Sequence, residues 1–470
     1  MFTSIAKNTI IQMAGKVISL FLSLIAIGMM TRYLGREGFG YYITATSFLQ
    51  IFATLVDFGI SLTIVRMIAS VNVDESKTMS AIMTLRVIST AVFLALAVAM
   101  IWFFPYNIFI KLGAIITVFA FFATNIIQAL AGVFQKQLKM IEVTIAELVG
   151  RIVWIGSVAV VIWLDKGIYW MFGTLSVCLL VNLLIQFLFS RKYIVWRWSV
   201  DIAIWKEVLK KTWPIALSIS FNLIYLRMDT IILSLTRTQA EVGLYGATYR
   251  VIDILTLLPA IFMGIVLPVA VRYFSENNKV ELRSLLQKSF DALMIFAVPI
   301  TVGTLLVSQK LMVLVAGQEF AAAGGILNLL IAAVIPIFCM TLFGYAVVAI
   351  DRQRSIMWGF LIDAVLTMVG YLIFIPMYGY WGAAAMTVFS ELFIMVWGAA
   401  VVYKHIHFFP SFKVFIRVLP ATFLMAIALW LAAGWHVLAL LVLAGAVYLA
   451  LVYLMGGVKK ETVKELIGLK

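Results

Sequence analysis

Long apolar runs, each of about 18 residues or more, recur along the whole chain and constrain its fold more than any other feature. Of the 470 residues, 64% are hydrophobic and only 12% are charged, whereas soluble domains carry about 25% charged residues. Inside a bilayer the backbone must satisfy its own hydrogen bonds, so continuous runs of this length predict membrane-spanning α-helices. A β-barrel would instead show ~10-residue segments of alternating polarity. We therefore expect an all-α polytopic membrane protein.

About fourteen spans can be placed on the sequence. They run near residues 9–31, 41–68, 79–103, 112–134, 144–163, 167–189, 213–236, 247–272, 289–308, 324–349, 355–375, 381–403, 416–434 and 436–455. With the N-terminus in the cytoplasm, most Lys and Arg residues of the loops fall on the cytoplasmic side, as the positive-inside rule requires. Both termini are then cytoplasmic, and the first span is a retained helix because no small-residue cleavage site follows it. These loops explain the net charge of +14, so nucleic acid is not an expected partner.

The longest connection between spans divides the chain near its middle. It mixes Trp196, Trp198 and Trp205 with several cations, a composition that favours the headgroup layer and makes membrane lipid an expected partner. We interpret it as a surface-lying connector; a specific lipid-sensing role is the alternative. The predicted domains are an N-terminal six-helix lobe at 1–190, an interfacial linker at 191–212, a C-terminal six-helix lobe at 213–405, and two extra helices with a basic tail at 406–470.

The two predicted lobes share short sequence patterns at matching positions. A Gly-x-Tyr pattern opens the second span at Gly40 and the eighth span at Gly243, and Gly167 and Gly379 precede the sixth and twelfth spans. An even number of spans separates the matching helices, so the repeats have the same orientation. Parallel repeats of this kind commonly place a substrate site at their interface.

Six cationic side chains lie inside spans that are otherwise apolar. They are Lys16, Arg66, Arg86, Arg151, Arg227 and Arg250. A cation near the bilayer centre costs roughly 2.5–3.5 kcal/mol, so such residues face a protein interior or a water-filled cavity. Cations around a shared cavity suit an anionic cargo, and the fork of an arginine suits phosphate oxygens. We therefore predict a transporter of an anionic substrate with these six residues as candidate substrate contacts.

The six cations differ in how strongly they favour that interpretation. Arg227 lies deepest, while Arg66 and Arg250 lie near span ends and can extend to an interface. Glu147 and Arg151 are four residues apart and Arg250 and Asp253 three apart, so both pairs can form ion pairs within one helix. Arg227, Arg86 and Lys16 are therefore the first candidates for cargo contact.

Acidic residues also lie inside the spans. They are Asp57, Glu147, Asp229, Asp253, Asp363 and Glu391. A buried acid pairs with a cation or titrates as it binds a cation. Asp57, Asp229, Glu391 and Glu147 are thus candidates for H⁺ or Na⁺ coupling or for salt-bridge gating, and the sequence leaves both open.

Enzymatic motifs are lacking in the sequence. There is no Gly-Lys-Ser/Thr phosphate loop, no nucleophile elbow and no HExxH zinc motif. His405 and His407 fall in a turn without an acid or thiol partner, and Cys178 and Cys339 both lie in apolar runs. No cofactor, metal or catalytic residue is therefore predicted, and the chain is not expected to be an enzyme.

Several stretches resemble a known family. They are residues 31–42 (TRYLGREGFGYY), 56–60 (VDFGI) with Arg66, 228–230 (MDT), 241–245 (EVGLY), 317–320 (GQEF) and 375–384 (IPMYGYWGAA). Over residues 5–405 their order and spacing resemble polysaccharide-export flippases, the Wzx-like lipid-linked oligosaccharide translocases of the multidrug/oligosaccharidyl-lipid/polysaccharide superfamily. Glycines in the first motif are expected to make the tight turn between two spans.

The resemblance implies two lobes that alternate between inward-open and outward-open states in the bacterial inner membrane. The implied cargo is an undecaprenyl-pyrophosphate-linked glycan, flipped to the outer leaflet for polysaccharide or O-antigen biosynthesis. Glycosyltransferases and a glycan polymerase would be functional partners. Two alternatives remain: a cation-coupled multidrug antiporter of the same superfamily, which would place acids in its cavity, and a membrane enzyme such as a polymerase or acyltransferase.

Overall fold

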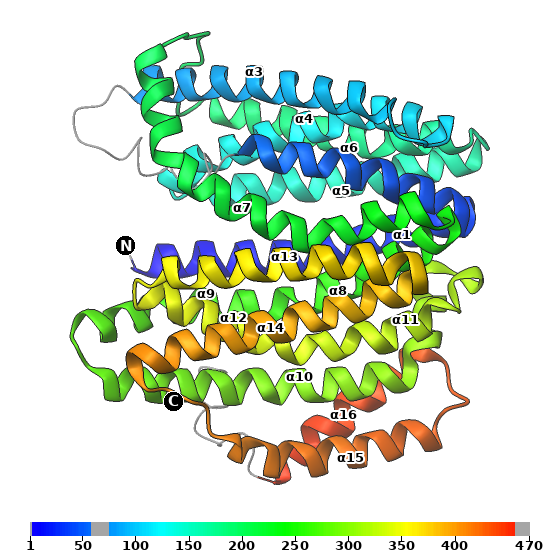
Figure 1. Cartoon of the computed structure of the whole chain (residues 1–470), viewed down its shortest axis with the longest axis vertical. Helices are drawn as coiled ribbons and strands as arrows, with labels where there is room; N and C mark the ends of the chain where they lie inside the picture. The colour runs from blue at the N-terminus through cyan, green and yellow to red at the C-terminus, as the bar shows by residue number, and fades with distance from the viewer. Residues whose placement is uncertain (1, 58–74, 456–470) are drawn as a thin grey trace. The chain divides into compact units, whose positions relative to one another are not determined.

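The structure, a computed structural model, describes residues 2–57 and 75–455, and within these ranges every regular element is a helix (Figure 1). The α-helices are α1 Phe2–Asp57, α3 Glu75–Ile101, α4 Ile108–Lys136, α5 Met140–Trp163, α6 Ile168–Ser190, α7 Ile202–Thr236, α8 Gln239–Leu255, α9 Leu257–Ser275, α10 Lys279–Ala316, α11 Ala323–Leu330, α12 Val334–Ala349, α13 Gln353–Tyr378, α14 Tyr380–Ile406, α15 Phe415–Leu431 and α16 Val437–Leu454. Short 3-10 turns lie at Gln318–Phe320, Ile331–Ala333 and Phe412–Val414. The all-α prediction is confirmed.

Twelve of the described helical segments are long and apolar enough to cross a membrane. Two details reconcile this number with the predicted spans. First, α1 is two helices joined at Gly35, whose φ of 65° turns the chain, so α1 carries the first two spans up to residue 57. Second, α7 contains the predicted span 213–236, which is not one of these twelve segments. Residues 58–68 of the second span lie outside the described residues.

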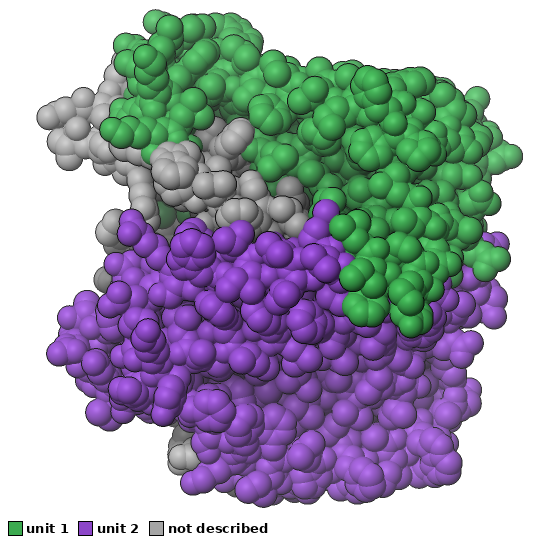
Figure 2. Space-filling model, in the orientation of Figure 1, with its two compact units in different colours: residues 1–246, 371–379 green, residues 247–370, 380–470 purple. Residues whose placement is uncertain are grey.

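The chain forms two compact units, which we describe separately (Figure 2). The first comprises residues 1–246 and 371–379, and the second comprises residues 247–370 and 380–470. In the first unit α4 packs against α6 and α1, α5 against α1 and α6, and α7 against α1 and α3. In the second unit α10 packs against α9, α12, α15 and α16, and α12 against α14. The predicted lobe boundaries at 190 and 213 stay a prediction.

Small residues permit the close helix packing that membrane proteins rely on in place of the hydrophobic effect. Between α4 and α6, a Cβ added to Gly113 would lie 2.3 Å from the Phe172 ring. Between α5 and α6, one added to Gly150 would lie 3.0 Å from the Cys178 carbonyl oxygen. Each glycine therefore lies where an added side chain would meet the neighbouring helix, with a clash at Gly113 and a tight contact at Gly150.

The Gly-x-Tyr repeats meet each other in the first unit. A Cβ on Gly40 would lie 1.8 Å from the carbonyl oxygen of Gln239, and one on Gly243 would lie 1.9 Å from that of Arg36. Each glycine thus contacts the carbonyl four residues before the other, so the crossing of α1 with α8 is reciprocal. This corrects the sequence-based interpretation of the first motif: Gly35 makes the turn, whereas Gly40 is required for helix packing.

Gly167 and Gly379, the second pair of repeat glycines, both adopt positive φ, at 78° and 60°, directly before α6 and α14. A positive φ favours glycine because it has no Cβ. The shared conformation agrees with the repeat that the sequence indicates.

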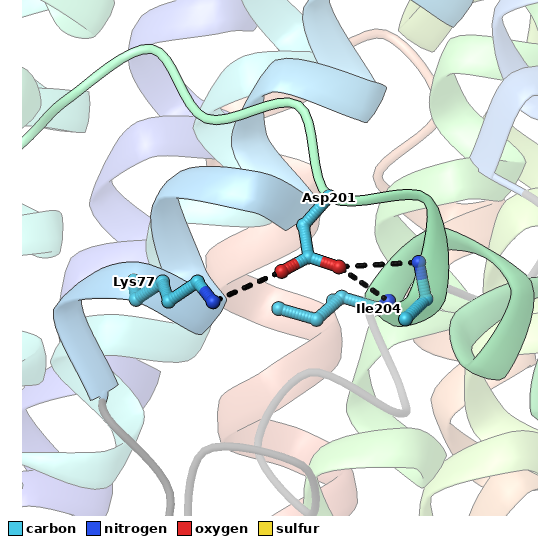
Figure 3. Close-up of polar contacts among 4 residues, drawn as sticks. Lys77, Asp201 and Ile204 are labelled. Carbon is cyan, nitrogen blue, oxygen red and sulfur yellow. Dashed lines mark hydrogen bonds and ion pairs between the residues drawn. The ribbon is translucent and has the colours of Figure 1, made fainter.

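The predicted linker lies along α3. The backbone N–H of Arg197 donates to Ser80 Oγ at 3.3 Å, and that of Ser199 donates to Thr84 Oγ1 at 3.2 Å. Asp201 then caps α7, because its carboxylate accepts from the backbone N–H groups of Ala203 and Ile204 at 3.1 and 3.2 Å (Figure 3). The other oxygen of Asp201 lies 3.1 Å from Lys77 Nζ, which ties the start of α7 to the start of α3.

The charge of Asp201 is stabilised by these contacts. The hydrogen bond from the Ile204 N–H and the contact with Lys77 lower the pKa of the Asp201 carboxyl. A group whose pKa is lowered by folding contributes stability above its unfolded pKa, near 3.9, and loses it as the pH falls below that value.

Candidate functional site

A polar cluster between α1 and α5 brings together two of the predicted charged residues of the first unit. Ser19 of α1 is 2% exposed, and its Oγ donates to Glu147 Oε1 at 2.7 Å. Arg151 Nε, one turn further along α5, donates to the same Oγ at 3.3 Å. The guanidinium of Arg151 also lies over the Trp154 ring, 5.4 Å from its centre. Ser19 is therefore the shared partner of an acid and a base.

This arrangement corrects the predicted pairing of Glu147 with Arg151. The two residues are joined through Ser19 and form no direct ion pair between them. Sequence spacing on α5 could not reveal Ser19, which lies on a different helix. Arg151 is only half-buried, and among the described residues its guanidinium has the single weak hydrogen bond to Ser19, so its other donors could reach an anionic group.

Lys16 lies one turn before Ser19 on α1, and its side chain is exposed. The neighbouring Gly15 is buried against Thr144 of α5, where an added Cβ would lie 2.1 Å from Thr144 Cγ2. This close approach fixes α1 on α5 and holds the lysine at the edge of the cluster. Lys16 and Arg151 thus present two positive charges from adjacent helices, with Glu147 beside them.

Arg227 of α7 is half-buried, and its guanidinium forms no hydrogen bond or ion pair with any described residue. Asp229, two residues along, is 1% exposed and accepts a hydrogen bond from the Tyr245 hydroxyl at 2.7 Å. The expectation that Arg227 and Asp229 do not pair is therefore met. Sequence reasoning missed Tyr245 as the partner of Asp229, since its Gly-x-Tyr motif was interpreted as architecture only.

Arg86 of α3 has a different environment, since none of its side chain is exposed. Its Nε donates to the carbonyl oxygen of Asn125 at 3.2 Å, and its Nη1 donates to that of Val56 at the same distance. Its Nη2 donates to Gln128 Oε1 at 3.3 Å. In this conformation Arg86 joins α3 to α1 and α4, and it could reach a cargo only after rearrangement. Its predicted cargo contact stays a prediction.

The remaining predicted cations are Arg66 and Arg250. Arg66 lies outside the described residues, as does the side chain of the acid Asp57. In the second unit, Arg250 Nη1 lies 3.6 Å from Asp253 Oδ2, which confirms the ion pair predicted from their spacing.

Two acids occur together in the interior of the second unit. Asp363 of α13 is fully buried and accepts hydrogen bonds from Thr367 Oγ1 at 3.2 Å and from Ser390 Oγ at 2.7 Å. Glu391 of α14 follows Ser390 directly, is 8% exposed, and forms no hydrogen bond or ion pair with any described residue. Two carboxylates in an apolar interior are costly unless a proton or a cation compensates them. The sequence pointed to Glu391 but did not place Asp363 beside it.

Across the part of the chain that the structure describes, no group of three or more His, Cys, Asp and Glu side chains could hold a metal ion. His405 contacts the carbonyl oxygen of Val401 at 2.9 Å in the last turn of α14. Cys178 and Cys339 are free and buried, far too hidden for thiolate chemistry.

Comparisons with known proteins identify a matching family and a curated relative. The sequence model of the family described as "Polysaccharide biosynthesis protein" matches residues 5–277, more than half of the chain. A relative from Haloferax volcanii, the "Probable low-salt glycan biosynthesis flippase Agl15", is 22% identical over 421 residues, which cover 87% of this chain and 84% of the relative.

Solved structures share the fold. The chain is similar to the lipid II flippase MurJ in an inward closed conformation, with a TM-score of 0.76, 15% identity, and coverage of 96% of this chain and 99% of the other. It is also similar to an inward-facing multidrug resistance MATE family transporter of the MOP superfamily, with a TM-score of 0.67, 13% identity, and coverage of 83% and 94%. At these identities the likeness is one of fold.

Proposed function

Because the chain belongs to the polysaccharide biosynthesis protein family, we propose that it is a flippase for a lipid-linked oligosaccharide whose carrier is a polyprenyl pyrophosphate. Undecaprenyl pyrophosphate is the carrier expected for O-antigen or related polysaccharides. The cargo would move from the cytoplasmic to the outer leaflet of the cytoplasmic membrane by alternating access. Both termini would be cytoplasmic, glycosyltransferases would supply the cargo, and a glycan polymerase would use it.

The observation that carries this proposal is that the charge of Arg227 has no partner among the described residues. A half-buried guanidinium in a membrane helix is costly unless it faces an anionic partner or a wet cavity. No described residue supplies an anionic partner for Arg227, so we infer that the phosphate of the transported cargo is that partner. Lys16 and Arg151 add two further cations on α1 and α5 of the same unit, while the lipid tail of the cargo would remain in the bilayer.

A vesicle assay tests this role of Arg227. Purified protein is reconstituted into liposomes that contain a fluorescent lipid-linked oligosaccharide, and flipping is followed by quenching of the outer-leaflet fluorophore. A hydrogen bond to a charged group contributes about 1.5–3 kcal/mol, so Arg227→Gln should slow flipping roughly 10- to 150-fold. Arg227→Lys keeps the charge but loses the forked guanidinium, so its flipping rate should lie between those of the parent protein and Arg227→Gln.

Arg250→Gln is the matched control, because Arg250 already has Asp253 as its ion-pair partner. It should retain flipping within about threefold, since exposed ion pairs contribute little. Equal flipping by Arg227→Gln and by the unaltered protein, with both equally inserted, would refute the role of Arg227. Efflux of organic cations by the same vesicles would support the multidrug antiporter instead.

We further propose that Asp363 and Glu391 hold the coupling cation, H⁺ or Na⁺. The two carboxyl groups lie together, and neither has a basic partner among the described residues. Glu391→Gln should make flipping independent of an imposed pH or Na⁺ gradient. Asp363→Asn should weaken the dependence less, because the amide retains a Ser390 hydrogen bond. A gradient response that is unchanged in both variants would refute the coupling role.

A further inference from the structure

A large apolar cavity lies in the second unit, and none of the charged residues described above is part of its lining. Its volume is about 560 Å³, and it lies between α10, α12, α14 and the connection from α14 to α15. The lining includes Phe290, Met294, Cys339, Met395, Ala399 and Phe412, and none of the described lining side chains is charged. From Met395 to Tyr403, α14 rises ~12 Å along its wall, so the cavity is long enough to take an extended chain.

Hydrogen bonds hold the wall at one end of the cavity. Gln287 of α10 donates through Nε2 to the Ser411 carbonyl oxygen at 3.0 Å, and it accepts from the Ser411 N–H at 2.7 Å. Arg283 Nε donates to the Ile406 carbonyl oxygen at 2.6 Å. The rings of Phe290 and Phe412 meet edge to face at 5.7 Å. The connection is therefore fixed on α10, and the cavity mouth is preformed.

Exposed cations are adjacent in sequence to the residues that line one end of the cavity. Lys404 follows the lining residue Tyr403, and Lys413 lies between the lining residues Phe412 and Phe415; both lysines are exposed. Arg417 is also exposed, although Asp291 of α10 acts on it electrostatically. Exposed aromatic rings beside Lys and Arg are typical of the headgroup layer. The positive-inside rule places this end of α14 at the cytoplasmic surface.

We propose that the cavity binds one acyl chain of an anionic phospholipid from the cytoplasmic leaflet. The chain lies against the apolar wall, and the phosphate lies between Lys404 and Lys413. The acyl chain of a neutral lipid would make the same apolar contacts, but its headgroup would leave the two ammonium groups without a counter-charge. Basic pockets between helices on the cytoplasmic side are suited to anionic headgroups, and each cation adds about a fivefold factor in affinity. None of the residues proposed to contact the cargo belongs to this cavity, so the proposal does not rest on the flippase function.

Native mass spectrometry of the purified full chain tests the proposal, with phosphatidylglycerol and phosphatidylcholine as probes. Lys404→Gln with Lys413→Gln should weaken phosphatidylglycerol binding roughly 25-fold and leave phosphatidylcholine binding unchanged. The charge-retaining pair Lys404→Arg with Lys413→Arg should bind normally. Ala400→Phe fills the cavity and should abolish the tightest binding, whereas Ala385→Phe, at an exposed position of α14 outside the cavity, should not.

Three outcomes would overturn the proposal. Equal binding of phosphatidylglycerol and phosphatidylcholine would show that the two lysines do not select an anionic headgroup. Unchanged phosphatidylglycerol binding by Ala400→Phe would show that the lipid binds outside this cavity. Displacement of phosphatidylglycerol by an equimolar polyprenyl phosphate would assign the cavity to the cargo tail. Equal melting temperatures of Ala400→Phe and the parent protein show that a loss of binding is not a folding defect.

Discussion

The reciprocal contact of Gly40 and Gly243 offers a quantitative test of how α1 and α8 pack. An added Cβ would lie 1.8 Å from the Gln239 carbonyl oxygen or 1.9 Å from that of Arg36, whereas ordinary contact begins near 3.4 Å. Both neighbours are backbone atoms, so they cannot rotate away, and the helices must separate by about 1.5 Å. Overpacking of this kind costs about 1–3 kcal/mol, and the two substitutions share one contact, so their effects should not add.

Such a cost changes the ratio of packed to separated helices about 5- to 150-fold. We expect Gly40→Ala and Gly243→Ala each to move spin labels at Glu37→Cys and Thr238→Cys further apart in pulsed electron resonance. Gly156 is the control, because nothing lies within 4 Å of its added Cβ; Gly156→Ala should leave the distance unchanged. If the distance distribution of both alanine variants matched that of the parent, the contact would not hold these helices together.

The remaining predictions concern single contacts. Ser19→Ala leaves Glu147 Oε1 without its buried donor and should lower stability by about 1–3 kcal/mol, measured by thermal unfolding in detergent; an unchanged melting temperature would contradict the bridging role. Asp201→Asn keeps a helix-capping side chain but loses the charge. We expect this variant to lack the loss of stability that the parent protein should show below about pH 4, and to be less destabilised at pH 7 than Asp201→Ala, as measured by thermal unfolding. Arg86→Lys cannot reach three acceptors at once and should unfold at a lower temperature even where flipping persists; equal unfolding temperatures would argue against a structural role.

The helices could be predicted because the membrane forces long apolar runs into helical form. Contacts within one helix could also be predicted. The spacing of Arg250 and Asp253 predicted an ion pair, which the structure confirms. Helix breaks were harder to predict. The predicted span 247–272 is divided between α8 and α9 near Thr256, a break that Pro259 in the first turn of α9 explains, because proline has no N–H to donate to the carbonyl of Leu255.

Contacts between distant segments could not be predicted, since no local pattern encodes them. Ser19 lies on a different helix from Glu147 and Arg151, and its role depends on α1 packing against α5. The acceptors of Arg86 are mostly backbone carbonyls, which every sequence contains. For the same reason, an arginine within an apolar span predicts a polar environment but not whether that environment is protein or cargo.

The central claim is that Arg227 meets an anionic lipid-linked glycan during transport, and direct binding of that cargo tests it. We expect purified protein in lipid nanodiscs to bind a polyprenyl-pyrophosphate-linked oligosaccharide, and Arg227→Gln to weaken that binding at least tenfold while Arg250→Gln binds as the parent does. Equal affinity in all three proteins would contradict the claim.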